Sequence, residues 1–530
     1  MPVCVLEERT AACKGRARAA PWRGDGRFPM IRSDPTAFLN REVYVRPSLR
    51  PTFLALVPVL TACAASAPTP QGGPEPAAVS APASLPAAIP APAPLPSGVA
   101  PSGEDPRIRE IVAAVSPARL ERDDRTLVGF QTRHTLSDTV SATRGIGASR
   151  RWLFAEFQRI SQACGGCLEV MYVSDVVKGG SSPRIDHDVN IVDVVAVQRG
   201  RTDPDRYALM TAHYDSRVGD VMDSTSFAPG ANDDGSGTVA LLEAARALSR
   251  YQFDGTVVYA ALAGEEQGLL GGEVLSRYVK QHGWRIEGVL NNDIIGNTSG
   301  VNGVTENSTA RVFGPGIPVN APEAELRRYL YSGGELDTPS RELMRYVDRV
   351  ADSYVLNLDV RMIYRLDRFG RGGDHTPFFQ QGFPAVRVTE TNEEYTRQHQ
   401  EVRTQNGIRY GDLPEGVDFP YLAKMTALNA ATLASLAWAP ASPDSVTITG
   451  ALQPSATLRW RPVSAPDLAG YRVYWRDPES ATWDHSRWVG NVTQATIDQV
   501  TIDNYFFGVA AVDREGHESR IVFPAPGRER

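Results

Sequence analysis

The chain has 530 residues, which exceeds the usual size of one domain, so two or more structural units are expected. Its hydrophobic content of 42% and its charged content of 22% are ordinary for a globular protein. A formal net charge of −7 provides no basic surface for a nucleic-acid backbone, so nucleic acid is not expected as a partner.

Residues 1–63 are predicted to be a leader that ends in a lipoprotein-type signal. Arg46 and Arg50 precede a short apolar run, which ends in Leu-Thr-Ala-Cys at Cys63. A basic segment, an apolar segment and small residues in this order are typical of a secretory signal, and LTAC resembles a bacterial lipoprotein box. We expect an exported protein that is periplasmic or anchored to the outer membrane by a lipid on Cys63. An ordinary signal peptide and secretion are the alternative.

Residues 64–105 are dominated by alanine, proline, serine and glycine, as in PAPAPLPSG. Such a segment cannot bury a core and its prolines favour an extended chain, so we expect a disordered, semi-rigid tether. No apolar run of 20 residues follows it. A membrane is therefore expected as a partner only through the lipid on Cys63.

Residues 106–439 alternate between short β-rich runs and helical runs. Strand-like runs occur at 207–213, 256–264, 287–296 and 384–390, and helix-like runs at 238–251, 340–356 and 421–438. Near-continuous apolar strands that alternate with helices predict an α/β domain. Its sheet should be mixed, mostly parallel and covered by helices on both faces.

Residues 440–526 contain β-type runs only, separated by turn signals. Short alternating strands over this length predict a sandwich of two sheets. Trp460, Tyr471 and Tyr505 stand where such a domain places its core aromatics, and the segment resembles a fibronectin type III module.

Cys164 and Cys167 form a single CxxC motif in a chain of five cysteines. One such motif cannot complete a four-ligand zinc site by itself. In an exported protein we expect the pair to form a local disulfide, with unpaired structural thiols as the alternative.

Polar residues that suit metal binding follow the predicted strands of residues 106–439. They are His213 and Asp215 in TAHYDS, Asp233 in PGANDDGSG, Glu265 and Glu266 in ALAGEE, Asp293 in VLNNDIIG and His375 in RGGDHTPF. Ligands of doubly wound sheets bind beyond the carboxyl ends of the strands, so these five segments are expected to meet in one crevice. Singly, each motif is more typical of a turn, a helix cap or a strand end. Their joint occurrence at strand ends favours a metal site.

Two metal ions suit these residues better than one. So many carboxylates would not stay ionised together without cations between them, and a set of histidines and carboxylates suits Zn²⁺. One zinc could not use five ligands and keep a position open for water, whereas two ions that share one carboxylate could. The predicted chemistry is hydrolysis by a metal-activated water. One of the adjacent glutamates then binds metal while its neighbour acts as general base.

Residues 206–436 resemble the co-catalytic dizinc exopeptidases of the MH clan, typified by bacterial leucyl aminopeptidases and glutamate carboxypeptidase II. The motifs H-x-D, N-D-D-G-S-G, G-E-E-x-G-L-x-G, N-x-D-x-I-G and D-H-x-P-F occur in the family's order. The resemblance implies that His213 and Asp293 bind one zinc, that Glu266 and His375 bind the other, and that Asp233 bridges them.

The resemblance also implies roles for the residues beside these ligands. Glu265 would be the general base, and Asp215 would orient His213. A cis peptide is implied between Asp233 and Asp234.

Substrate recognition lies outside the shared motifs. Arg371 in GRGGDH and Tyr395 in ETNEEYTRQHQ are candidates, with Tyr395 as the catalytic group that stabilises the oxyanion. Many relatives have a Tyr-His pair in this stretch, whereas Tyr395 is followed by threonine and the next histidine is residue 399. A loop aromatic packed at the rim is the alternative for Tyr395.

We expect an extracytoplasmic zinc aminopeptidase that acts on peptides or proteins as a monomer. A carboxypeptidase or a single-zinc glutaminyl cyclase on the same fold, or a non-catalytic binding protein, are the alternatives. Retention of all five ligands disfavours the last two. Residues 440–526 could bind cell-wall or extracellular polymer, or could serve as a spacer.

Overall fold

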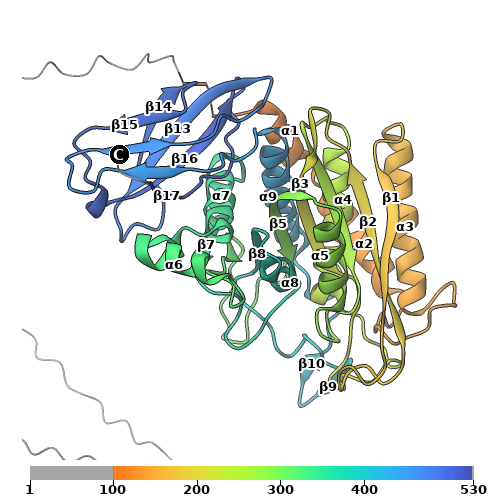
Figure 1. The fold of residues 1–530 in the computed structure, drawn as a ribbon. Helices are drawn as coiled ribbons and strands as arrows, with labels where there is room; N and C mark the ends of the chain where they lie inside the picture. The colour runs from red at the N-terminus through yellow and green to blue at the C-terminus, as the bar shows by residue number, and fades with distance from the viewer. Residues whose placement is uncertain (1–99, 102, 528–530) are drawn as a thin grey trace, which may run out of the picture. The chain divides into compact units, whose positions relative to one another are not determined.

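The computed structural model describes residues 100–101 and 103–527, which all belong to one compact unit. The predicted leader, the lipidation site Cys63 and nearly all of the predicted tether lie outside the described residues. An α/β region at 106–438 is followed by a β region at 447–526 (Figure 1).

An eight-stranded sheet in the order β1-β2-β4-β3-β5-β8-β6-β7 forms the centre of the α/β region. Its strands are β1 (Glu169–Val177), β2 (Val189–Gln198), β3 (Asp203–His213), β4 (Gly255–Leu262), β5 (Arg285–Asn292), β6 (Thr309–Phe313), β7 (Asp359–Ile363) and β8 (Ala385–Glu390). The neighbours β4, β3, β5 and β8 run parallel, as do β6 and β7. The pairs β1–β2, β2–β4 and β6–β8 are antiparallel. The predicted mixed, mostly parallel sheet is confirmed.

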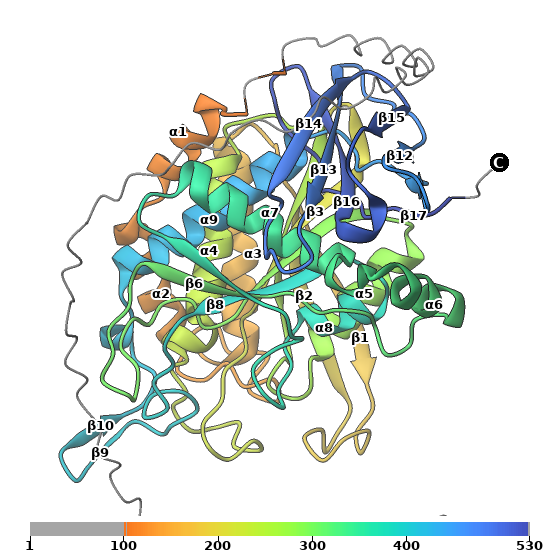
Figure 2. The same ribbon diagram turned by 90° about the vertical axis from the view of Figure 1, so that its left-hand side faces the viewer.

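Helices cover both faces of this sheet, as Figures 1 and 2 show. On one face lie α1 (Pro106–Ala114), α2 (Pro117–Val128), α3 (Gly145–Ala163), α4 (Gly237–Leu248), α7 (Pro339–Tyr354) and α9 (Phe419–Trp438). On the other face lie α5 (Leu270–Gln281) and α8 (His375–Gln380). Among the described helices, none is both long enough and apolar enough to cross a membrane.

Local sequence explains the central elements. Every residue of β4 is buried, as expected for a strand that is covered on both faces. The long helix α9 is almost entirely buried, and it begins after Asp418, whose side chain accepts a hydrogen bond from the Tyr421 N–H. The short hairpin of β9 (Arg403–Gln405) and β10 (Ile408–Tyr410) projects from the α/β region beside the ends of the parallel strands (Figure 2).

The β region consists of two sheets that enclose a core of their own. One has the order β15-β12-β11-β17 and the other β14-β13-β16. Their strands are β11 (Thr447–Thr449), β12 (Ala456–Arg459), β13 (Leu468–Arg476), β14 (His485–Gly490), β15 (Gln494–Ile497), β16 (Phe506–Asp513) and β17 (Ala525–Pro526). Trp460 and Tyr471 are buried in this core and Tyr505 packs against it. The strand-rich region is thus confirmed, whereas its likeness to a fibronectin type III module stays a prediction.

Buried ion pairs join the β region to α7. Asp337, just before α7, accepts hydrogen bonds from Arg345 at 2.8 Å and from Arg476 of β13 at 2.8 and 3.0 Å. The Trp483 indole donates to Glu342 at 3.0 Å. The side chains of Asp337, Arg345 and Arg476 are at most 2% exposed, so the two regions share a polar core.

Cys164 and Cys167 form a disulfide with their Cα atoms 5.6 Å apart. The expected local disulfide is therefore confirmed. It closes the turn that follows α3.

Candidate metal centre

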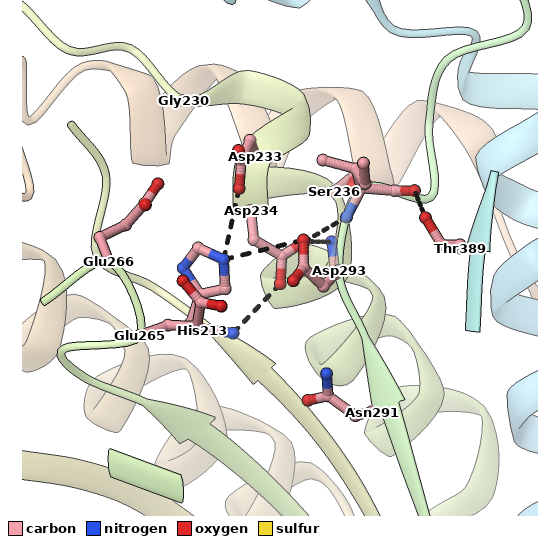
Figure 3. A network of polar contacts seen from close by, with 12 residues as sticks. His213, Gly230, Asp233, Asp234, Ser236, Glu265, Glu266, Asn291, Asp293 and Thr389 are labelled. Atoms are coloured by element: carbon pink, nitrogen blue, oxygen red, sulfur yellow. Dashed lines mark hydrogen bonds and ion pairs between the residues drawn. The ribbon is translucent and has the colours of Figure 1, made fainter. Parts of the chain in front are cut away.

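Five of the predicted residues lie together at one edge of the sheet, where its parallel strands end (Figure 3). His213 is the last residue of β3 and Asp293 follows β5 directly. Glu265 and Glu266 lie between β4 and α5, and Asp233 lies in the segment that leads into α4. Because β3, β4 and β5 are parallel neighbours, their carboxyl ends meet at this edge.

The segment that carries Asp233 is held from several sides. The N–H groups of Asn232 and Asp233 donate to one Asp412 oxygen at 2.9 and 2.7 Å. Gly230 has φ +51°, and a Cβ there would lie 2.6 Å from the Asp233 carbonyl oxygen, so only glycine fits. The peptide bond between Asp233 and Asp234 is cis, as the family resemblance implies.

The Asp234 side chain points away from that of Asp233 and accepts hydrogen bonds from backbone N–H groups. Its Oδ2 accepts from the His213 N–H at 3.1 Å, and its Oδ1 accepts from the Gly237 N–H at 2.9 Å. The adjacent aspartates therefore have different roles: Asp234 fixes strand β3 to helix α4, and Asp233 faces the centre.

A first group of potential ligands consists of His213, Asp233 and Asp293, which are all buried and lie within 4.8 Å of one another. His213 Nε2 lies 3.3 Å from Asp233 Oδ1 and 3.9 Å from Asp293 Oδ1. Arg387, which is fully buried, holds Asp293 Oδ1 at 3.0 Å.

A second group consists of Asp233, Glu266 and His399, again within 4.8 Å of one another. His399 Nε2 lies 2.8 Å from Asp233 Oδ2 and 2.8 Å from Glu266 Oε1. Gln398 donates to the same Asp233 oxygen at 2.9 Å. The two oxygens of Asp233 thus face different histidines, one in each group.

The second histidine is not the predicted one. His375, the first residue of α8, belongs to neither group, and its Nε2 donates to the Leu366 carbonyl at 2.7 Å. Burial lowers the pKa of His375 to about 4, so its ring is neutral. The connection between β8 and β9 brings His399, and not His375, beside Asp233 and Glu266. His375 Nδ1 is buried and has no hydrogen-bond partner among the described residues, and the ligand role of either histidine stays a prediction.

Asp215 lies where the sequence predicted it. Its Oδ1 is 3.5 Å from His213 Nδ1, and its two oxygens accept from the N–H groups of Glu265 and Glu266 at 3.2 Å. The Thr135 hydroxyl donates to Asp215 at 3.0 Å. One buried carboxylate thus fixes the histidine of the first group together with the backbone of both glutamates.

Glu265 lies beside both groups and is partly exposed. Desolvation, together with the nearby carboxylates of Asp293 and Glu266, raises the pKa of Glu265 well above its ordinary value, and His213 opposes this shift. Its carboxylate has no hydrogen-bond partner among the described residues, so it is free to approach a bound molecule.

The two predicted substrate-binding residues lie further out. Tyr395 is 55% exposed. Arg371 is half-exposed and lies 3.7 Å from Glu393. Neither belongs to the metal-binding groups, and their roles stay predictions.

The buried polar atoms of both groups fit a bound cation. His213 Nε2, Glu266 Oε1 and His399 Nε2 are shielded from water and face the other potential ligands of their own group. Burial alone would lower the pKa of His399, but Glu266 and Asp233 outweigh it and raise the pKa to about 10. These carboxylates therefore attract positive charge, and histidine nitrogen with carboxylate oxygen is a donor set that suits zinc.

Three residues of this centre were missed by sequence reasoning. His399 and Gln398 lie in ETNEEYTRQHQ, and Arg217 lies in HYDSRVG. The one available signal was a histidine four residues after Tyr395, in the stretch where many relatives carry one.

Comparison with known proteins gives the family of the chain. The profile of peptidase family M28 matches residues 193–412. A probable zinc metalloprotease of Pyrenophora tritici-repentis is 41% identical over 483 residues, which cover 90% of this chain and 99% of that protein. One from Leptosphaeria maculans is 44% identical over 430 residues, with 81% and 99% covered. The chain belongs to peptidase family M28.

Solved structures with related folds are more distant. The LapA aminopeptidase of Legionella pneumophila is 17% identical, with 65% of this chain and 76% of that chain covered and a TM-score of 0.45. The glutaminyl cyclase of Porphyromonas gingivalis is 16% identical, with 60% and 98% covered and a TM-score of 0.40.

Proposed function

We propose that the chain is an exported zinc aminopeptidase with two metal positions that share Asp233. His213 and Asp293 would hold one ion, and Glu266 and His399 would hold the other. Zinc is supported by the donor set and by the relatives, which are called probable zinc metalloproteases.

One observation carries the proposal: the two oxygens of Asp233 face different histidines, at 3.3 Å from His213 Nε2 and 2.8 Å from His399 Nε2. Each oxygen of one carboxylate can bind a different ion, and each Asp233 oxygen here has a histidine beside it that could complete such a position. The arrangement therefore supports two ions.

When bound, zinc supplies Lewis-acid chemistry: it polarises the scissile carbonyl and lowers the pKa of water. The chain supplies the proton transfers and the positioning. Glu265, next to the ligand Glu266, takes a proton from the attacking water and gives it to the leaving amine. Asp215 contacts His213 and the backbone N–H groups of the two glutamates and so fixes their relative positions.

A preference for free amino termini is part of the proposal through the motifs of residues 206–436, which resemble those of leucyl aminopeptidases. The hollow beside Asp233 holds only about 10 Å³, and its Glu393 pairs with Arg311 and Arg368 at 2.7 and 3.1 Å, so the choice between amino and carboxyl termini is left to the experiment below.

The proposal also includes export and a lipid anchor on Cys63. The signal pattern at residues 45–63 and the disulfide between Cys164 and Cys167 support it, because disulfides persist mainly outside the cytoplasm. The β region remains a candidate for contact with an extracellular polymer, and the working form is a monomer.

Release of free amino acid from matched unblocked and N-acetylated peptides tests the proposal. We expect turnover of the unblocked peptide only, and its loss in Glu265→Gln. Glu273→Gln makes the same chemical change at an exposed position of α5 and should keep full activity. Cleavage of the acetylated peptide from its carboxyl end would indicate a carboxypeptidase, and no turnover of either peptide would leave a binding protein.

A further inference from the structure

A buried polar segment between α2 and α3 contacts the candidate metal centre from outside its motifs. Thr132, Arg133, His134 and Thr135 are at most 4% exposed, and they precede the motifs of residues 206–436. Buried polar side chains are nearly always hydrogen-bonded, so this segment needs partners. Several of these partners lie in the loop that follows β3 and in the loop that precedes α4.

Arg133 fixes the segment against both loops. Its Nε donates to the Tyr214 carbonyl at 2.7 Å, and its backbone N–H donates to the Ser216 hydroxyl at 3.2 Å. Its Nη1 donates to the Pro229 carbonyl at 2.6 Å, and its Nη2 donates to the Gly230 carbonyl at 2.8 Å. The planar guanidinium has its donors in fixed directions, so it sets the distance between the two loops. The residues that follow Arg133 are held in place with it.

Thr135 lies two residues further along and contacts Asp215. The Thr135 hydroxyl donates to Asp215 Oδ2 at 3.0 Å. An ionised carboxylate can only accept, so the direction of this hydrogen bond is unambiguous. The same carboxylate accepts from the N–H groups of Glu265 and Glu266 at 3.2 Å. Thr135 therefore gives a further donor to a carboxylate that is inaccessible to water.

The contacts between Asp215 and His213 suit a metal on the far side of the imidazole. His213 Nδ1 lies 3.2 Å from the Asp215 carbonyl oxygen and 3.5 Å from its Oδ1. Both oxygens can only accept, so the neutral ring carries its proton on Nδ1 and keeps a lone pair on Nε2. Nε2 lies 3.3 Å from Asp233 Oδ1, on the side where a cation would bind. A fixed Asp215 therefore keeps His213 in the form that binds zinc.

We infer that Thr135 is a positioning residue, whose hydroxyl holds Asp215 in the orientation that serves His213 and the backbone of the two adjacent glutamates. The inference rests on the proposed function, because a metal beside His213 gives this orientation its importance. Without the hydroxyl, Asp215 Oδ2 would keep only the Glu266 N–H as a donor among the described residues, and the carboxylate could turn away from the imidazole. A hydrogen bond to a charged group contributes about 10–100-fold to an equilibrium constant.

Thr135→Val and Thr135→Ser test the inference, because valine has nearly the shape of threonine without the hydroxyl and serine keeps the hydroxyl. Hydrogen exchange, followed by mass spectrometry on the peptide that contains Glu265 and Glu266, reports on their N–H groups with or without metal. We expect about 10–100-fold faster exchange of these groups in Thr135→Val and wild-type exchange in Thr135→Ser. Thr432→Val is the matched control, since the buried Thr432 hydroxyl donates to the Leu428 carbonyl within α9, and it should leave this exchange unchanged.

Two further measurements connect the hydroxyl to metal binding and to turnover. Removal of an outer partner of a metal ligand lowers metal affinity by about 10–100-fold, and Thr135 acts one contact further out than Asp215. In Thr135→Val we therefore expect about 10-fold weaker binding of one zinc ion, measured as metal content after dialysis against buffered free zinc. The kcat value should fall by about 10-fold with little change in KM, because Glu265 is displaced while substrate binding is retained.

Unchanged exchange in Thr135→Val would overturn the inference. Faster exchange in Thr135→Ser as well would overturn it, because shape and not the hydroxyl would then matter, and equal acceleration in Thr432→Val would indicate a general loss of stability instead. A wild type without zinc and without turnover would refute the proposed function, whereas exchange in the metal-free protein still decides whether Thr135 holds Asp215. If Thr135→Val does not fold, Thr135→Ala removes the same hydroxyl and carries the comparison.

Discussion

The ion cluster around Asp337 is expected to hold the β region to the α/β region. Asp337→Ala removes the carboxylate that Arg345 contacts at 2.8 Å and Arg476 at 2.8 and 3.0 Å, and both arginine side chains are at most 2% exposed. Removal of one partner of a buried ion pair costs roughly 3–5 kcal/mol, because an uncompensated charge stays buried. Arg345 keeps Glu342 as a partner, so a value near the lower end, about 3 kcal/mol, is expected.

Urea unfolding followed by tryptophan fluorescence measures this loss in free energy of unfolding. The matched control is Glu323→Ala, which removes an exposed carboxylate that pairs with Arg327, and it should cost below about 0.5 kcal/mol. A loss under about 1 kcal/mol in Asp337→Ala would show that the buried cluster is no stronger than a surface ion pair and does not hold the two regions together. A β region that unfolds separately in the wild type would contradict this role of the cluster as well.

Three further predictions concern the site and pH. Glu265→Gln should reduce kcat by about 10²–10⁴-fold with unchanged zinc content, and loss of zinc instead would make Glu265 a ligand. Removal of zinc by a chelator should lower the free energy of unfolding, and added zinc should restore it. The expected gain is roughly 2.7 kcal/mol when the free zinc concentration is 100 times its Kd. An unfolding curve that chelation leaves unchanged would contradict the presence of buried metal ions. Burial alone would lower the pKa of His517, but hydrogen bonds and charge interactions with Asp513 and Asp105 outweigh burial and raise this pKa. The stabilisation by protonated His517 is therefore complete below about pH 6.5 and is lost as the pH rises through the folded-state pKa. His517→Asn should therefore destabilise the protein most at pH 6 and least at pH 9 in unfolding experiments, and a gap that widens with pH would contradict this.

The residues predicted at strand ends lie together at one sheet edge because local sequence determines where those strands end, and their ligand roles stay predictions. The apolar runs before His213 and Asp293 fix β3 and β5, and their parallel pairing brings the strand ends together. The glycines around Asp233 and after Glu266 mark the turns that follow. Periodicity and turn chemistry are properties of adjacent residues, so one sequence suffices to read them.

No local pattern predicts that His399 approaches Asp233 and Glu266. Its connection has no periodicity, and its path depends on contacts with Arg217 and Asp233, which lie far away in the sequence. His375 was predicted instead because it belongs to the D-H-x-P-F motif. The buried cluster around Asp337 escaped prediction for the same reason, since its charged residues come from separate regions.

The proposed mechanism depends on two metal ions that share Asp233. Anomalous diffraction at the zinc absorption edge, from crystals of the purified protein, can locate them. We expect two peaks on opposite sides of this carboxylate, one beside His213 and one beside His399. A single peak, or a second peak beside His375, would contradict it.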